Sequence, residues 1–261
     1  MPPQESLTTH LPTLTPHSLH RATTHPFLQR AGQGTLPKPV LEQWLSQDRL
    51  YAQSYIRFIG LLLSKLRFPA KPQSETESQS ASLESRLSST LIDALVNIRR
   101  EIEFFEATAA AYGLDLSAST STTPAGEEEG GKEFGPNAIT HAYIDLFMAA
   151  GSPGASVLEG MVVLWATETC YLRAWRFAAG FLDQRQGGTQ DTDGGALRKE
   201  FIPNWSSREF EGFVDGIGEL VDVMARGGVA DGEKGEVMRR CERWWRQVVW
   251  LEERFWPDVS L

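Results

Sequence analysis

The feature that most constrains the fold of this chain is the run of residues 157–182, which is of helical length and apolar almost all the way round. A helix that is apolar on every side is buried in a protein core, with other elements packed around it. At about 100° of rotation per residue, Glu168 falls in the middle of the apolar surface formed with Met161, Leu172 and Trp175. Burying an ionised carboxylate without a partner costs several kcal/mol, so we expect Glu168 to be hydrogen-bonded, paired or protonated.

The rest of the chain also has the pattern of helices. Apolar residues recur at helical spacing in the segments 25–36, 40–66, 91–112, 137–150, 157–182, 201–226 and 236–256. No stretch shows the sustained alternation of a half-buried strand, and no tight hairpin turn joins two β-branched runs. We therefore predict an all-α protein, a bundle of seven to eight helices with its sites between facing helices.

The length and composition suit a single large domain, because 41% of the 261 residues are hydrophobic. Residues 1–24 are rich in Ser, Thr and Pro and have no apolar signal core, so they are predicted to be a disordered tail. Residues 25–261 are predicted to form the helical domain. Polar insertions near 71–89, 117–136 and 183–196 are predicted to be loops, since they contain few apolar side chains to bury.

The charge and the cysteines limit the partners and the compartment. A net charge of −9 argues against nucleic acid and anionic membrane surfaces as partners. The longest apolar runs, such as residues 61–63, are far shorter than the ~18 residues of a membrane span. Cys170 and Cys241 lie inside apolar helical patterns without disulfide or metal spacing. We expect a soluble cytoplasmic protein with no nucleic-acid or membrane partner.

The sequence lacks the motifs of common cofactor and metal sites. GxGxxG, GxxxxGK[ST] and GxSxG are absent, and these motifs mark dinucleotide, P-loop and α/β-hydrolase sites. Of the 5 histidines, all but His141 lie near the N-terminus, without HExxH or ExxH spacing. No histidine is placed with the inward-facing acids as a metal ligand, so we predict neither a metal nor a cofactor.

Three predicted helices each place one acid in the middle of an apolar face, namely Asp48, Glu168 and Glu252. An arginine or the backbone can satisfy a single buried acid structurally, which is the alternative for each of them. Three such acids in one core are expected to share a pocket, where close carboxylates separate into an acid and a base. The aromatic residues nearby are either plain core or the walls of a pocket for a flat ring; they are Trp44, Tyr51, Tyr55, Tyr143, Tyr171, Trp175, Trp205 and Phe255.

Cys170 is the other candidate for chemistry on the central helix. It follows Glu168 by two residues, which is about 200° of rotation, so the two side chains point to opposite sides. Cys170 shares its side with Val163, Ala166 and Phe177, where a thiol usually acts as a small apolar filler. We therefore favour Glu168 over Cys170 as the residue that faces a pocket.

Three stretches of the sequence resemble the TenA family, known as thiaminase II or aminopyrimidine aminohydrolase, which has the haem-oxygenase-like fold. These stretches are HPFLQRAGQGTL, LEQWLSQDRLYAQSY and the closing LEERFW, and the resemblance covers roughly residues 25–256. It implies that Asp48 holds the amino group and ring nitrogen of a pyrimidine, with Tyr51 beside it. It also implies that Glu252 handles protons at the leaving amine and that Tyr143 is a pocket tyrosine.

The central helix reads WATETCYLRAW, which resembles the branch of the family that has a Glu in WAxExxY where the other branch has a Pro-Cys pair. The resemblance implies Glu168 and Glu252 as the catalytic residues. Trp205 stands where a pocket tyrosine is common. The expected substrate-binding residues are Asp48, Tyr51, Trp44, Tyr143, Tyr171, Trp205 and Phe255.

The function that this resemblance implies is hydrolysis of 4-amino-5-aminomethyl-2-methylpyrimidine, or of its N-formyl form, in thiamin salvage. The expected assembly is a homo-oligomer, either a dimer or a tetramer. The alternative is a non-catalytic protein that binds a pyrimidine or another flat ligand on the same bundle. Haem or quinone-precursor oxidation on this fold needs an axial His or a His-lined pocket, which the sequence does not offer.

Overall fold

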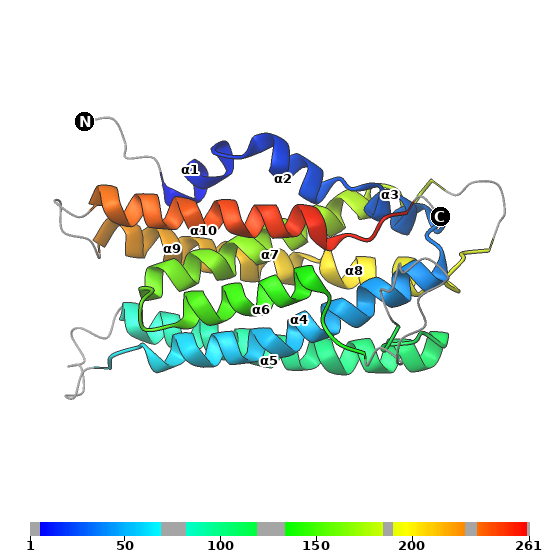
Figure 1. Cartoon of the computed structure of the whole chain (residues 1–261), viewed down its shortest axis with the longest axis horizontal. Helices are drawn as coiled ribbons and strands as arrows, with labels where there is room; N and C mark the ends of the chain where they lie inside the picture. The colour runs from blue at the N-terminus through cyan, green and yellow to red at the C-terminus, as the bar shows by residue number, and fades with distance from the viewer. Residues whose placement is uncertain (1–5, 69–81, 119–133, 185–189, 228–233, 260–261) are drawn as a thin grey trace.

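The computed structural model describes residues 6–68, 82–118, 134–184, 190–227 and 234–259, and the described part is all-α (Figure 1). Its helices are α1 (Leu7–Thr13), α2 (Pro16–Thr23), α3 (Pro26–Gln33), α4 (Lys38–Ser64), α5 (Leu83–Tyr112), α6 (Ala138–Gly151), α7 (Val157–Ala179), a π-helix (Leu197–Phe201), α8 (Ile202–Trp205), α9 (Arg208–Gly227) and α10 (Lys234–Phe255). The predicted all-α class is confirmed. No described helix is both long enough and apolar enough to cross a membrane.

Helix α7 lies at the centre of the bundle, as its apolar surface predicts. It packs against α10, α9, α3, α2, α8 and α6, while α4 packs against α5 and α6. Residues from every side of α7 are buried, including Met161, Ala166 and Trp175, which are completely enclosed. Figure 1 shows α4, α5, α6, α7 and α10 running along the long axis of the molecule.

The apolar core is divided into two clusters along this axis. One cluster contains Ala52 of α4, Leu164 of α7 and Val248 of α10. The other contains Trp44 of α4 and, further along the same helices, Trp175 of α7 and Trp256 just after α10. The residues between these positions therefore form a transverse layer through the bundle, which we call the boundary layer.

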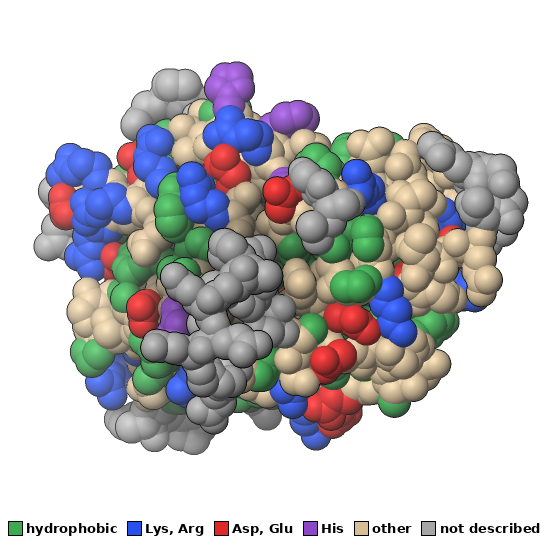
Figure 2. Space-filling view, turned by 45° about the vertical axis from the view of Figure 1, so that its right-hand side comes forward, with side chains coloured by type: hydrophobic (Ala, Val, Ile, Leu, Met, Phe, Trp, Pro, Cys, Tyr) green, Lys and Arg blue, Asp and Glu red, His purple; other side chains and the backbone are tan. Residues whose placement is uncertain are grey.

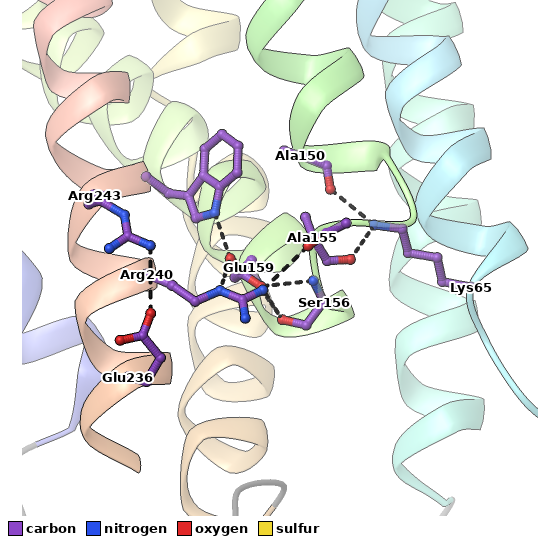
Figure 3. Close-up of polar contacts among 10 residues, drawn as sticks. Lys65, Ala150, Ala155, Ser156, Glu159, Glu236, Arg240 and Arg243 are labelled. Atoms are coloured by element: carbon purple, nitrogen blue, oxygen red, sulfur yellow. Dashed lines mark hydrogen bonds and ion pairs between the residues drawn. The ribbon is translucent and has the colours of Figure 1, made fainter. Parts of the chain in front are cut away.

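The start of α7 is fixed by a network of polar contacts (Figure 3). The Ser156 side chain accepts a hydrogen bond from the Glu159 backbone N–H, and the Glu159 carboxylate accepts one from the Ser156 backbone, which completes a capping box. Arg240 and the Trp244 indole of α10 also donate to Glu159, at 2.5 and 3.0 Å. Burial opposes the charge of Glu159, but these hydrogen bonds outweigh it and lower its pKa to about 2. Lys65 donates to backbone carbonyls at 150 and 155, joining α4 to the same turn.

The prediction of a disordered tail at residues 1–24 is wrong for the described part, residues 6–24. Helix α1 packs on α9, and α2 packs on α10 and α7. Leu7, Leu11 and Leu19 are buried at 3%, 0% and 6% exposure. The serines, threonines and prolines suggested a loop, but Ser6 caps α1 and Pro16 begins α2, both of which are favourable helix-start positions.

One of the three predicted loops is shorter than expected, whereas the described parts of the loops near 117–136 and 183–196 are non-helical as predicted, apart from Ala196. Helix α5 begins at Leu83 after the cap Ser82, inside the predicted loop 71–89; residues 69–81 lie outside the described part, as do 119–133 and 185–189. The predicted helix 201–226 is divided between the π-helix, α8 and α9. Because of this division and of α1 and α2, the described helices outnumber the seven to eight predicted.

The surface in Figure 2 carries Lys and Arg side chains most densely toward one end, with Asp and Glu among them. On α10, Arg239 and Arg243 form ion pairs with Glu236, at 2.8 and 3.9 Å. Both arginines and Glu236 have more than half of their side-chain surface exposed, and such surface pairs contribute little to stability.

Candidate functional site

A cavity of about 290 Å³ opens between α5 and the α8–α9 segment. Its deep residues include Tyr55 and Trp205, which are 2% and 3% exposed. Glu101 and Glu168 also line it and are half-buried. Exposed side chains, among them Arg100, form the rim. The wall combines aromatic rings, among them Phe104, Phe210 and Phe213, with polar and charged side chains, and a concave pocket that offers both is a candidate site for a small molecule.

Glu168 lies on α7 and faces this cavity. The Tyr55 hydroxyl of α4 donates a hydrogen bond to its Oε1 at 2.7 Å. Burial raises the pKa of Glu168 to about 7, although the Tyr55 hydrogen bond favours the ionised form and partly offsets the effect. Glu168 is therefore close to half ionised at neutral pH, which suits a general base.

Asp48 lies on α4 and is 3% exposed. The Tyr171 hydroxyl of α7 donates to its Oδ2 at 3.2 Å. Burial raises the pKa of Asp48 to about 8; the Tyr171 bond acts in the opposite direction, and the charges of Glu252 and Glu168 raise the pKa further.

Glu252 lies on α10 and is 6% exposed. Its Oε1 accepts a hydrogen bond from the Tyr143 hydroxyl of α6 at 2.5 Å. Burial raises the pKa of Glu252 to about 8, the Tyr143 bond lowers it, and the charge of Glu168 raises it. Glu253, the next residue, points outward and forms an ion pair with Arg21 at 2.7 Å, as the helical geometry requires.

The boundary layer brings the three predicted acids together. Asp48, Glu168 and Glu252 each lie on their helix between residues of the two apolar clusters. Their charges also interact, because Glu168 raises the pKa of both Asp48 and Glu252, and Glu252 raises the pKa of Asp48. Within the described residues, none of the three forms an ion pair with Lys, Arg or His. The structural alternative, an arginine or the backbone that satisfies each acid, is therefore not what the described part of the chain contains, where the hydrogen bonds to the three acids come from tyrosine hydroxyls.

The Tyr51 hydroxyl is within reach of the charges of all three acids, and the Tyr51 ring contacts the Phe255 ring. The Tyr51 ring packs edge-on against Tyr143, with ring centroids 5.1 Å apart, and lies 5.9 Å from the Phe255 ring. The charges of both Glu168 and Glu252 act on the Tyr51 hydroxyl, and together with burial they raise its pKa well above 10.0. Tyr51 thus stays a neutral hydrogen-bonding group near these acids.

Trp44, Tyr171 and Trp205 form an aromatic group on the other side of Asp48. Tyr171 and Trp205 have ring centroids 5.4 Å apart, and Trp44 and Trp205 lie 5.7 Å apart. Of the predicted site residues, only Glu168 and Trp205 line the 290 Å³ cavity itself. Asp48, Glu252, Tyr51, Tyr143, Tyr171 and Phe255 are not part of its lining. Asp48, Glu252 and Tyr143 are buried, whereas Tyr51, Tyr171 and Phe255 are half-buried. Trp44, at 1% exposure, belongs to the core.

One acid of the site was not predicted. Glu101 of α5 lines the cavity together with Glu168, and the Trp205 indole Nε1 donates to its Oε1 at 2.9 Å. Burial raises its pKa to about 8, and the charges of Asp48 and Glu168 contribute. The sequence did contain a signal, because Glu101 is flanked on its helix face by Ile98 and Phe105. These two residues belong to different apolar clusters, so Glu101 is also part of the boundary layer.

Cys170 lies on the packed side of α7, away from the cavity. It is 1% exposed and is not among the residues that line the cavity. Burial raises the pKa of its thiol well above 9.0, and the charge of Glu252 acts in the same direction. Such a thiol has little thiolate for nucleophilic attack. In the part of the chain that the structure describes, no cluster of His, Cys, Asp and Glu has the arrangement needed to hold a metal ion.

An all-α bundle with an acid layer across its core and an adjoining aromatic cavity defines a class of helical proteins with an internal small-molecule site. Residues 11–260 match the TENA/THI-4/PQQC family, and the chain therefore belongs to this family. The match begins within α1, so it includes residues 11–24 of the segment that had been predicted to be a tail.

Among the similar proteins, a relative and a solved structure carry the TenA name. The chain is 31% identical over 286 residues to a probable transcription factor of Fusarium pseudograminearum (strain CS3096), covering 99% of this chain and 53% of that protein. It is 24% identical over 150 residues to a probable bifunctional TENA-E protein of Glycine max, covering 58% of this chain and 54% of that protein. The chain thus spans about half the length of the curated relatives it matches. A solved TenA homologue from Pyrococcus furiosus has the same fold, with a TM-score of 0.69 at 24% identity, covering 96% of this chain and 98% of that one.

Proposed function

We propose that this protein hydrolyses thiamin-derived aminopyrimidines, in the manner of the glutamate branch of the TenA family. The observation that carries the proposal is the pair Glu168 and Glu252, a half-buried and a buried acid without ion-pair partners among the described residues, whose charges both act on the Tyr51 hydroxyl. Their raised pKa values of about 7 and about 8 make a base and an acid available together near neutral pH. The name of the Glycine max relative, which includes TENA-E, supports the choice of branch.

The proposed reaction divides the proton transfers between the two glutamates. Glu168, which ionises at the lower pH, removes a proton from water, and the oxygen attacks the carbon attached to the leaving nitrogen. The carbon–nitrogen bond breaks, and Glu252, protonated below a pKa of about 8, gives its proton to the nitrogen. With the aminomethyl substrate the products are the hydroxymethylpyrimidine and ammonia. With the N-formyl substrate, attack on the formyl carbon gives formate and the amine.

The predicted substrate-binding residues Asp48, Tyr51, Tyr143 and Phe255 would bind the pyrimidine ring during this reaction. Asp48, held by the Tyr171 hydroxyl, would orient the amino group and ring nitrogen of the pyrimidine. Tyr51, Tyr143 and Phe255 form a continuous group of rings, with Tyr143 and Phe255 edge-on at 5.5 Å, that would enclose the ring and exclude water.

The test is a direct assay of ammonia and formate release from the two pyrimidines. We expect Glu168→Gln and Glu252→Gln each to lower turnover by ~100-fold or more, since a general acid or base typically contributes that much. Glu253→Gln is the matched control for Glu252, because it removes an outward-facing acid from the neighbouring position. Full activity of Glu168→Gln would refute the assigned role.

The alternative, a protein that binds a flat ligand without catalysis, is supported by the same aromatic-walled cavity. A binder gains little from several buried acids that each cost desolvation energy, and this favours the enzyme. Tight calorimetric binding of an aminopyrimidine with no product after hours would decide for the binder. A homo-oligomeric assembly and a cytoplasmic location remain predictions.

A further inference from the structure

Glu168 belongs both to the cavity and to the acid layer. Its side chain lines the cavity of about 290 Å³, and its charge raises the pKa values of Asp48 and Glu252, which do not line it. In the reaction proposed above, Asp48 holds the pyrimidine ring and Glu168 activates water, while the cavity itself has no role. A ring bound beside Asp48 would leave the cavity open to whatever is attached to the leaving nitrogen.

The cavity is too large for the leaving groups of that reaction. Its volume of about 290 Å³ is roughly ten times the ~30 Å³ that one water molecule occupies in the liquid. Ammonia is about the size of a single water molecule, and formate is only slightly larger. Pockets for small-molecule ligands begin at roughly 300 Å³. The cavity therefore has room for a substituent with several more atoms than a formyl group.

The wall of the cavity offers both apolar and hydrogen-bonding contacts. The half-buried rings of Phe104, Phe210 and Phe213 line it. Asn97 of α5 and Asn204 of α8 also line it, and both are exposed. Among the described residues, neither asparagine side chain has a hydrogen-bond partner. Because a side-chain amide is both a donor and an acceptor, this pair matches a ligand group that is also both, such as another amide.

The charges around the cavity favour a neutral substituent. Arg100 and Glu209 line the rim with opposite charges, and both are exposed. Burial raises the pKa of Glu101 to about 8, and the charges of Asp48 and Glu168 act in the same direction, so Glu101 is mostly protonated at neutral pH. An anion would therefore find no buried positive charge among the lining residues. A cation would lower the pKa of Glu168 and make it a weaker base.

We propose that the cavity is a subsite for a neutral, amide-bearing acyl group attached to the leaving nitrogen of the pyrimidine. The inference rests on the proposed function and widens its substrate class to N-acylated 5-aminomethylpyrimidines larger than the formyl form. The rings of Phe104, Phe210 and Phe213 contact the chain of the acyl group. Asn97 and Asn204 exchange hydrogen bonds with its amide.

The reaction at such a substrate is hydrolysis of an amide. Glu168 removes a proton from water, and the oxygen forms a bond to the acyl carbon. The bond between that carbon and the nitrogen breaks, and Glu252 gives its proton to the nitrogen. The products are a carboxylic acid, released on the side of the cavity, and 4-amino-5-aminomethyl-2-methylpyrimidine.

The experiment compares the N-formyl and N-acetylglycyl amides of that aminopyrimidine as substrates of the full chain. We expect the KM of the N-acetylglycyl amide to be ~10-fold or more lower, since a few additional groups held in a pocket contribute that much. Asn97→Trp puts a large ring at the rim and should raise this KM, relative to that of the N-formyl amide, by ~10-fold or more. Asp93→Trp is the matched control, because Asp93 is exposed one turn earlier on α5 and does not line the cavity. It should leave the ratio of the two KM values unchanged.

The outcomes separate this inference from the proposed function. If Asn97→Trp changes both KM values by the same factor, the cavity is only an entrance and the inference is wrong. A wild-type KM that is no lower for the N-acetylglycyl amide also overturns it, while hydrolysis of the N-formyl amide keeps the proposed function. If neither amide is hydrolysed, the proposed function is wrong, and calorimetric binding of the two amides decides the subsite by the same ~10-fold preference. If Asn97→Trp does not fold, Asn204→Trp, at the other exposed asparagine, takes its place.

Discussion

Replacing Glu168 by Gln should make the stability of this protein less sensitive to pH. The folded protein holds the pKa of Glu168 at about 7, compared with an ordinary value of 4.5 in the unfolded chain. Between these values the folded state keeps a proton that the unfolded state has lost, so stability falls as pH rises. This contribution is fully present below pH 4.5 and is lost by about pH 7. Glutamine keeps an oxygen for the Tyr55 hydroxyl and does not titrate, so the variant avoids the loss.

The size of the effect follows from the two pKa values. At 1.36 kcal/mol for each pH unit, the interval from 4.5 to about 7 corresponds to at most about 3 kcal/mol. Water reaches Glu168 through the cavity, which reduces this figure. The measured quantity is the free energy of unfolding of Glu168→Gln minus that of wild type. We expect this difference to increase by about 1 to 3 kcal/mol as the pH is raised from 4.5 to 8.

Urea denaturation of both proteins across that pH range measures the difference. Glu253→Gln is a control of opposite sign, because the hydrogen bond from Arg21 lowers the pKa of Glu253 and its removal should cost stability at neutral pH. The reasoning is refuted if the difference between Glu168→Gln and wild type is constant with pH, or if the variant becomes relatively less stable as pH rises.

Three further predictions test other parts of the structure. Cys170→Ala should lower the free energy of unfolding by about 1 kcal/mol and leave turnover per folded molecule within ~2-fold of wild type; rapid inactivation by iodoacetamide, blocked by an aminopyrimidine and abolished in this variant, would return chemistry to the thiol. Glu159→Gln should lower the free energy of unfolding by about 2 kcal/mol at pH 7, measured by urea denaturation, and by much less at pH 2. The reason is that the pKa of Glu159 is lowered to about 2, so the stabilisation by its charge is lost as the pH falls from 4.5 through that value. Leu11→Ala should cost about 3 kcal/mol by the same assay, since Leu11 is fully buried; a change near zero would mean that α1 does not pack on the bundle.

Helical periodicity was sufficient to find the acids of α4, α7 and α10, because each lies within a regular apolar face. It also separated Glu168 from Cys170 and Glu252 from Glu253, since an offset of one or two residues changes the direction of a side chain by 100° or more. The same argument was not applied to Glu101, which follows Arg99 and Arg100 and opens the segment EIEFFE, so charged neighbours concealed its inward direction.

Other features depend on contacts that a single sequence does not display. The cavity forms between α5 and the α8–α9 segment, and their pairing is a tertiary property. The N-terminal helices were missed because Ser, Thr and Pro count as loop residues by composition, whereas here they cap and begin helices. The start of α9 is marked in the sequence, because Ser207 is a favourable cap residue, and its side chain accepts a hydrogen bond from the Phe210 backbone N–H at 3.2 Å.

The packing of the first helices on the last ones imposes an order on folding during synthesis. Thr8 bonds to Asp222 across 214 residues of chain, and the Trp256 indole donates to the Ala22 carbonyl across 234. A growing chain leaves the ribosome with its N-terminus first, so α1 and α2 emerge long before their partners exist. The faces of α1 and α2 that carry Leu7, Leu11 and Leu19 are therefore not fully covered until α9 and α10 have been made, so these two helices are translated well before the helices that complete their burial.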